Sequence, residues 1–338
     1  TIVCILGMPW FLSLYTKKET VIAMGTAYAA RAFAFSIIIM LGISMEKIFQ
    51  SVGRMKVSML SMMCGFIANI ILDPLMIFGI GPFPEMGIAG AAYATGIGQT
   101  ITLIVYLLFA KLRPLPVSFR REFISFDKEL MKRIYSVGIP AALNMALPSL
   151  LISALNGILA PFSEKYVLVL GAYYKLQTFI YLTANGIIQG IRPIVSFNYG
   201  AGEGKRVRQT TRTTLALSAG VMAVGVILCY IIPSQMMGIF TKSEETVAIG
   251  VTALHIISIG FVFSAVSVTC CGVLEALSRG IPSLIISVMR YVVVIIPAAM
   301  LFSRLYGANG VFIAFPITEI ITAAASYIIY RKYCPKNG

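Results

Sequence analysis

Charge, histidine and paired cysteine are all scarce in this chain of 338 residues. Charged residues make up 12% of it, against roughly 25% in soluble globular proteins, which excludes a soluble enzyme, a nucleic-acid-binding protein and a disordered chain. The single histidine, His255, leaves little room for metal or histidine chemistry. The six cysteines form no Cys-x-x-Cys pair, so neither a disulfide framework nor a zinc site is supported.

Hydrophobic residues, in contrast, make up 58% of the chain. They could supply about ten membrane helices of roughly 20 apolar residues each. Glycine, proline and charged residues divide the chain into ten apolar segments: 1–15, 21–45, 57–80, 87–110, 133–160, 166–195, 210–233, 247–275, 281–303 and 308–330. The sequence therefore predicts an all-α, polytopic membrane protein with about ten transmembrane helices.

Basic residues are distributed unevenly over the expected loops. If the spans alternate strictly, 18 of the 27 Lys and Arg residues fall on one side of the membrane, 5 on the other and 4 inside spans. Cytoplasmic loops carry such an excess. We therefore expect loops 46–56, 111–132 and 200–209 and the C-terminus to be cytoplasmic. The +14 net charge needs no nucleic-acid partner.

Two parts of the chain resemble each other weakly. YTKKETVIAMG at 15–25 matches FTKSEETVAIG at 240–250 at an offset of 225 residues. GIAGAAYATGIGQ at 87–99 matches GANGVFIAFPITE at 307–319 at an offset of 220. Two homologous helix bundles are typical of secondary transporters.

The repeat predicts two pseudo-symmetric lobes of six helices each, the first of them incomplete. The second copy begins near residue 130, so the first would begin about 95 residues before Thr1. We therefore expect a parent protein of twelve spans that is truncated here at its N-terminus. The expected domains are an incomplete N-terminal lobe at 1–112 (from the last part of helix 3 to helix 6), a basic linker at 113–132 and a C-terminal lobe at 133–338 (helices 7 to 12).

Two segments resemble the MATE family of multidrug and toxic compound extrusion transporters. They are NIILDPLMIFGIGPFPEMGIAGAAYATGIGQ at 69–99 and GIIQGIRPIVSFNYGAGEGKRVRQ at 186–209. The resemblance implies an antiporter of the cytoplasmic membrane, a monomer and not an enzyme. It would export cationic or amphipathic organic compounds by alternating access, with Na⁺ or H⁺ as coupling ion and no other cofactor. A lipid-linked oligosaccharide flippase of the wider superfamily is the alternative.

Asn69 and Asp73 are candidates for the coupling site. They are four residues apart and share one face of a helix, and Asp73 is the only acid within the expected spans of the first half. A carboxylate at membrane depth is costly unless it is paired, hydrated or bound to a cation. The family resemblance adds Thr95 to this cation site, together with a first-helix Asp that would precede Thr1. The alternative is a hydrated Asp73 where Asp73-Pro74 ends or kinks the helix.

The second half holds another set of polar side chains in its expected spans: Lys175, Arg290 and Glu319, with Gln177 nearby in the sequence. Charges in three spans of one bundle should meet in its interior, because lipid does not tolerate them. They could pin the lobe together or form a proton relay, and Glu319 could contact the exported compound.

Two further expectations concern the second half. Some members of the resembled family carry a second cation site, but its acids align with Pro148 and Ser264, so we expect that site to be absent. Glu275 and Arg279 are four residues apart, a spacing that predicts an ion pair along one helix.

Overall fold

The computed structural model describes residues 2–13, 18–117 and 126–334 of the chain. These residues are almost entirely helical. They form two compact units, Thr1–Ile124 and Ser125–Gly338, called unit 1 and unit 2 below.

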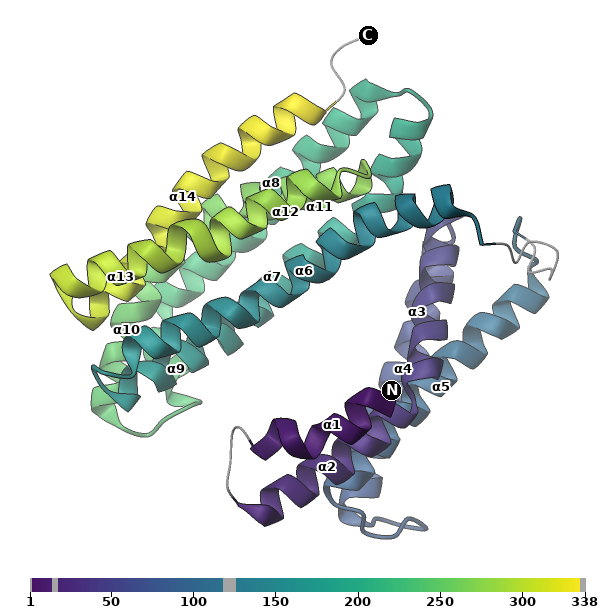
Figure 1. The fold of residues 1–338 in the computed structure, drawn as a ribbon, viewed down its shortest axis with the longest axis horizontal. Coiled ribbons are helices and arrows are strands. Elements are labelled where there is room, and N and C mark those ends of the chain that lie inside the picture. Colours follow the sequence, from purple (N-terminus) through teal and green to yellow (C-terminus); the bar gives the residue numbers. More distant parts are fainter. Residues whose placement is uncertain (1, 14–17, 118–125, 335–338) are drawn as a thin grey trace. The chain divides into compact units, whose positions relative to one another are not determined.

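Unit 1 contains five described helices (Figure 1). They are α1 (Ile2–Ser13), α2 (Glu19–Ala34), α3 (Ser36–Ser51), α4 (Met55–Phe78) and α5 (Ile88–Leu112). α4 and α5 pack against each other along much of their length, and α2 and α3 both contact α5. A small core forms where the rings of Phe49 and Tyr106 stack with their centroids 5.5 Å apart.

Unit 2 is larger (Figure 1). Its helices are α6 (Lys128–Leu159), α7 (Glu164–Gly200), α8 (Gly204–Ile231), α9 (Pro233–Gly238), α10 (Glu244–Ser258), α11 (Phe261–Ala276), α12 (Gly280–Val288), the π-helix Met289–Val294, α13 (Ile295–Tyr306) and α14 (Ala308–Tyr333). Side chains of Asp127, Ser163 and Ser243 cap the first turns of α6, α7 and α10, which explains where these helices begin.

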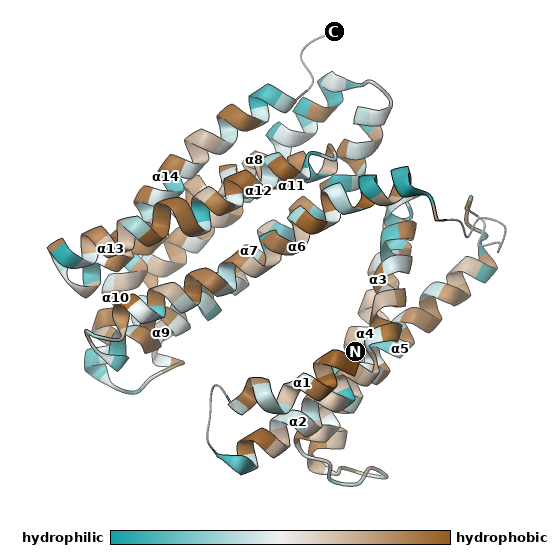
Figure 2. Cartoon of the chain, in the orientation of Figure 1, coloured by the Kyte–Doolittle hydropathy of each residue, from teal (hydrophilic) through white to brown (hydrophobic). Residues whose placement is uncertain are grey.

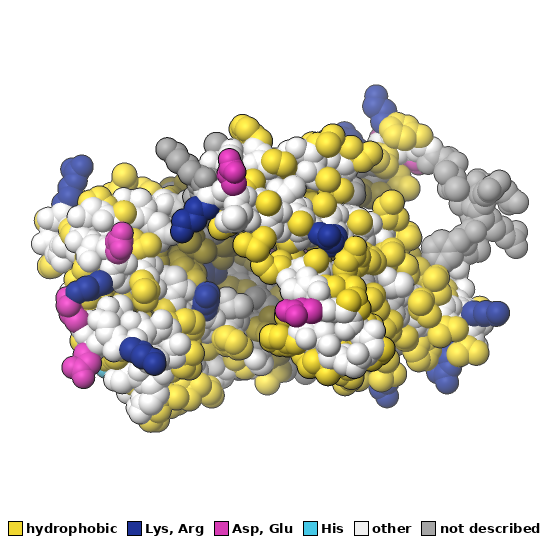
Figure 3. All heavy atoms as spheres, turned by 90° about the horizontal axis from the view of Figure 1, so that it is seen from below, with side chains coloured by type: hydrophobic (Ala, Val, Ile, Leu, Met, Phe, Trp, Pro, Cys, Tyr) yellow, Lys and Arg dark blue, Asp and Glu magenta, His cyan; other side chains and the backbone are white. Residues whose placement is uncertain are grey.

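Within the described ranges, six helices are long and apolar enough to cross a membrane, and there are up to eight spans if each of two bent pairs is one span. Hydrophobic residues occur along all the helices (Figure 2), and hydrophobic side chains are spread widely over the visible face (Figure 3). The chain is thus a multi-pass helical membrane protein. The expected count of ten is not confirmed by length and composition alone: α1 has only 12 residues, and α7 is not among these apolar spans.

The internal repeat is visible in where the helices start. Glu19, Ser36 and Met55 begin α2, α3 and α4, and the residues 225 positions later begin α10, α11 and α12. α5 and α14 begin 220 positions apart, each after a glycine with positive φ, Gly87 (+53°) and Gly307 (+64°). Residues with side chains rarely adopt such angles, so the same turn is built twice.

Both copies break a span at the same place. α2 and α3 are bent by 46° around Phe35, and α10 and α11 by 54° next to Gly260, its counterpart at offset 225. A Cβ atom on Gly96 of α5 would overlap the Phe35 ring, and one on Gly260 would lie 3.2 Å from Cα of Pro316. Gly96 and Pro316 are themselves counterparts at offset 220. At each break a large residue packs against a glycine. In unit 1 the large residue, Phe35, is at the break, whereas in unit 2 the glycine, Gly260, is at the break.

α4 and α5 cross with their backbones nearly in contact. A Cβ atom on Gly65 would overlap the Thr102 hydroxyl and would lie 2.6 Å from the carbonyl oxygen of Gly98. Small residues that let two helices approach closely are a common means of helix association in lipid. This crossing holds the two longest helices of unit 1 together.

We predict that Gly65→Ala destabilises the protein by about 1–3 kcal/mol, because the new methyl group overpacks the crossing. Gly220→Ala on α8 is the matched control, since nothing lies within 4 Å of its Cβ position, and it should leave stability unchanged or raise it slightly. Thermal unfolding in detergent measures both. Equal melting temperatures for the two variants would contradict this account of the crossing.

Candidate functional site

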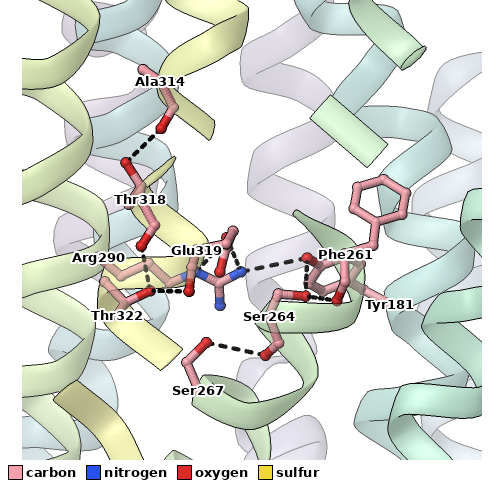
Figure 4. Close-up of polar contacts among 9 residues, drawn as sticks. All are labelled: Tyr181, Phe261, Ser264, Ser267, Arg290, Ala314, Thr318, Glu319 and Thr322. Carbon is pink, nitrogen blue, oxygen red and sulfur yellow. Dashed lines mark hydrogen bonds and ion pairs between the residues drawn. The ribbon is translucent and has the colours of Figure 1, made fainter. Parts of the chain in front are cut away.

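A buried ion pair lies in the middle of unit 2. Arg290 on the π-helix and Glu319 on α14 are 7% and 8% exposed. Arg290 Nε donates to Glu319 Oε1 at 2.9 Å, and Arg290 Nη2 donates to the same oxygen at 2.5 Å (Figure 4). Each charge thereby neutralises the other inside an apolar bundle, where an unpaired charge would be very costly.

Hydrogen bonds connect the ion pair to a series of hydroxyl groups. Arg290 Nη2 also donates to the Tyr181 hydroxyl at 3.4 Å, and Tyr181 donates to Ser264 Oγ at 2.6 Å. Ser264 in turn donates to the carbonyl oxygen of Phe261, at 2.6 Å (Figure 4). The network joins α7, α11, α14 and the π-helix. Connected hydrogen bonds of this kind strengthen one another in a low-dielectric interior.

The local helix geometry is unusual at Arg290. Residues Met289–Val294 form a π-helix between α12 and α13, and π-turns inside helices occur frequently at functional sites. Counted from the helix starts, Arg290 occupies the position of Gly65 in unit 1, and Glu319 that of Gln99. Unit 2 therefore places an ion pair where unit 1 has a tight glycine crossing.

The ion pair leaves one carboxylate oxygen unused. Both hydrogen bonds from Arg290 end on Oε1, whereas Oε2 of Glu319 is buried and has no hydrogen-bond partner among the described residues. The Tyr174 hydroxyl is likewise buried and unpaired within the described chain. A buried polar atom without a partner costs about 1–3 kcal/mol, so these two atoms mark a place where the fold is not optimised for stability alone.

Arg290, Glu319 and Tyr174 are among the residues that line a cavity of about 270 Å³ in unit 2. Its lining comes from α6, α7, the π-helix, α13 and α14. It comprises Pro148, Leu151, Ile152, Tyr174, Gln177, Thr178, Tyr181, Leu182, Asn185, Arg290, Tyr291, Ile295, Phe315 and Glu319.

The predicted charged set of unit 2 is only partly brought together. Gln177 lines the cavity beside Arg290 and Glu319, but Lys175 is exposed and its ammonium lies 5.9 Å from the centroid of the Phe240 ring. The expectation that Lys175 meets the pair is wrong. Successive helix residues point about 100° apart, so Lys175 turns away from the cavity that Tyr174 and Gln177 face.

In unit 1, α4 brings Asn69 and Asp73 together. Asn69 Nδ2 donates to Asp73 Oδ1 at 3.3 Å, and both side chains are half-buried. Thr95 lies on the neighbouring helix α5, exposed, with its hydroxyl donating to the carbonyl oxygen of Ala91 at 3.0 Å. Among the described residues, no hydrogen bond joins Thr95 to Asn69 or Asp73. Two members of the predicted cation site are thus adjacent, and the third keeps a bond within its own helix.

Comparison with known proteins decides the family. The MatE family model matches residues 1–75 and 140–301, well over half of the chain. The chain belongs to the MatE family. The multidrug export protein MepA of Staphylococcus aureus is 25% identical over 316 residues, which is 94% of this chain and 68% of MepA. MepA of Staphylococcus saprophyticus is 24% identical over the same shares of both chains.

Solved structures of MATE transporters share the fold. The Vibrio cholerae MATE transporter VcmN in its bent form has a TM-score of 0.89 and 23% identity, and the match covers 98% of this chain and 75% of VcmN. A multidrug resistance MATE transporter in its outward-facing conformation has a TM-score of 0.88 and 22% identity, with the same coverage of both chains. This MatE chain accordingly has the fold of the solved MATE transporters.

Sequence reasoning missed a second polar cluster of this MatE transporter. Glu275 does not pair with Arg279, as expected from their spacing. Its carboxylate instead forms an ion pair with Arg192, whose Nη2 lies 2.5 Å away. It also accepts hydrogen bonds from Asn144 Nδ2 at 3.1 Å and Ser283 Oγ at 3.0 Å. Arg279 lies over the Tyr333 ring. The cluster ties α6, α7, α11 and α12 together. The sequence did contain one indication of this cluster: Arg192 lies inside an expected span, where its charge requires a partner.

We predict that Arg290→Met destabilises the transporter by about 3–5 kcal/mol, because it leaves the Glu319 charge buried without a partner. The double variant Arg290→Met/Glu319→Leu removes both charges, and its melting temperature should be close to that of the wild type. Thermal unfolding in detergent compares them. If the double variant is as unstable as the single one, the pair acts through packing and not through charge compensation.

Proposed function

We propose that this chain is a cation-coupled multidrug antiporter of the cell membrane, with its C-terminus in the cytoplasm. Family membership and the MepA relatives, which are named as multidrug export proteins, support export of many compounds. The proposal of cation coupling depends on Asp73. Its carboxylate is half-buried in an apolar span, and its hydrogen-bond partner is the neutral Asn69 amide.

Asp73 can bind a proton or Na⁺ for a simple electrostatic reason. Unlike Glu319, it has no ion-pair partner among the described residues, so a bound cation is what would compensate its charge at membrane depth. Na⁺ prefers oxygen ligands, as hard cations do. Rotation of the Asn69 amide would turn its oxygen toward an ion held by the carboxylate, and Thr95 would add a hydroxyl from α5. Binding of the ion removes the charge and so favours a different helix arrangement.

The repeated helix plan supports alternating access. The helices of unit 1 and unit 2 start at matching offsets and break at matching residues, as expected for two homologous six-helix lobes of a twelve-span protein. We propose domains at 1–112 and 133–338 joined by a basic linker at 113–132, working as a monomer. Amphipathic organic compounds, cationic ones among them, are the proposed substrates.

We predict that Asp73→Asn lowers gradient-driven ethidium export at least tenfold, because Asn cannot exchange a cation during the cycle. Glu85→Gln is the matched control: Glu85 is the exposed acid in the turn between α4 and α5, and its loss should leave export unchanged. Export is measured in proteoliposomes of the full-length protein, under Na⁺ and proton gradients applied separately.

The two gradients separate the coupling ions, since only one of them should drive export by the wild type. Undiminished export by Asp73→Asn would overturn the assignment of the coupling site. An absence of export under both gradients would argue against an antiporter and favour the flippase.

A further inference from the structure

One tight turn is built in the same way in both units and carries an arginine at the same position. In unit 1, Gly53 has a φ of +77°, and the backbone N–H of Arg54 closes the turn with a hydrogen bond of 2.9 Å. In unit 2, Ser278 has a φ of +59°, and the backbone N–H of Arg279 closes it at 2.8 Å. Arg54 and Arg279 are counterparts at the offset of 225 residues.

The side chains of the two arginines are used differently. The guanidinium of Arg54 donates to the carbonyl oxygens of Arg113 and Pro114, at 2.5 and 3.0 Å, and so caps the end of α5. In unit 2 the counterpart of Arg113 is Tyr333, at the end of α14. Arg279 lies over the Tyr333 ring, with its Cζ 5.8 Å from the ring centroid. Its guanidinium donates no hydrogen bond to any described residue, so its donors are available to a ligand.

Two further cations lie at this end of unit 2, where α6 and α12 start and α14 ends (Figure 1). Lys332 Nζ is 5.8 Å from the centroid of the same tyrosine ring. A Cβ atom on Gly280, the residue after Arg279, would lie 3.1 Å from the carbonyl oxygen of Ser136 on α6, and Arg133 lies one helical turn before Ser136. We call Arg133, Arg279 and Lys332 the cationic patch.

The charges of the cationic patch are not compensated within the part of the chain that the structure describes. All three side chains are exposed, and none of the ion pairs found there includes them. Glu275, one turn before Arg279, is already paired with Arg192. Like charges that lie close together repel each other, so an anion bound among them would be stabilised.

The patch lies where the headgroups of a bilayer are expected. α14 has 26 residues, or a length of about 39 Å, whereas the hydrocarbon core of a bilayer is about 30 Å thick. A tyrosine at the end of such a span is typical of the membrane interface. Two exposed apolar side chains lie beside the patch, Ile328 one turn before Lys332 and Ile281 two residues after Arg279. The sequence of charge and then apolar surface matches that of a phospholipid.

We propose that the cationic patch binds the headgroup of an anionic phospholipid. Arg279 donates to the phosphate through its planar guanidinium, which can make two parallel hydrogen bonds, and Lys332 and Arg133 add positive charge. Ile281 and Ile328 contact the acyl chains. With the proposed cytoplasmic C-terminus, this lipid belongs to the inner leaflet. The site is separate from the proposed coupling site at Asp73, and binding of the lipid requires no ion gradient.

Binding of three probes to the purified full-length protein tests this proposal. Phosphatidylglycerol carries a net negative charge, phosphatidylcholine with the same acyl chains carries none, and glycerophosphoglycerol is the anionic headgroup without acyl chains. Native mass spectrometry in an uncharged detergent gives the apparent dissociation constant of the first bound molecule of each probe. Thermal unfolding of every variant shows whether it is folded.

Phosphatidylglycerol should bind more tightly than both other probes. Arg279→Gln and Lys332→Gln should each weaken its binding about fivefold, the effect of one basic residue near an anionic lipid. Arg304→Gln is the matched control, because Arg304 is also exposed but lies at the opposite end of unit 2. Arg54→Gln is a second control, since Arg54 is occupied by carbonyl oxygens. Neither control should change lipid binding.

Three results would each overturn the proposal. Equal affinity for phosphatidylglycerol and phosphatidylcholine would show that the lipid's charge is not recognised. Equal weakening by Arg279→Gln and Arg304→Gln would show a general effect of charge. Glycerophosphoglycerol that binds as tightly as phosphatidylglycerol would identify a site for a soluble anion. Lys332→Gln keeps the patch testable if Arg279→Gln does not fold. All these results are independent of export, so the lipid site and the antiporter can be rejected separately.

Discussion

The cost of an uncompensated charge in lipid constrains this transporter more than any other single factor. Glu319 meets that cost with Arg290, and Glu275 meets it with Arg192 and two neutral donors. In the part of the chain that the structure describes, Asp73 has only a neutral amide, that of Asn69 one helical turn away, as its hydrogen-bond partner. The three acids therefore differ in kind: two have an arginine partner within the described residues, and for the third we propose a bound cation as the compensating charge. The presence or absence of an arginine partner thus distinguishes Glu319 and Glu275, which we regard as structural, from Asp73, the candidate for ion coupling.

The same helix plan, used twice, produces two different interiors. At the crossing of α4 with α5, glycine brings the backbones together. At the equivalent crossing in unit 2, the counterpart of Gly65 is Arg290, which lies in a π-helix. The breaks at Phe35 and Gly260 show the same principle, because each keeps one large and one small partner but exchanges them. The positions of turns and breaks are thus shared by the two units, whereas the residues at each crossing differ.

Much of this could be predicted from the sequence, for identifiable reasons. Apolar length predicts membrane helices, and matched turn residues such as Gly87 and Gly307 predict the repeat, because both signals are local. The place of Lys175 could not be predicted in this way: a shift of one residue along a helix turns a side chain by about 100°. The partner of Glu275 was also missed, since Arg192 lies on another helix and a long-range contact leaves no mark in sequence spacing. The expected span count is not confirmed at α1, which is short, or at α7, which mixes polar and apolar residues along its length.

The central claim is that Asp73 exchanges its cation while Glu319 stays paired with Arg290. A hydrophobic carbodiimide, which modifies protonated carboxyl groups within the membrane, tests both halves of the claim at once when the modified residues are mapped by mass spectrometry. The account predicts modification of Asp73 and none of Glu319. Modification of Asp73 should fall when Na⁺ is added if Na⁺ is the coupling ion, and should fall only as the pH is raised if the coupling ion is a proton. Modification of Glu319 with Asp73 untouched would contradict the account.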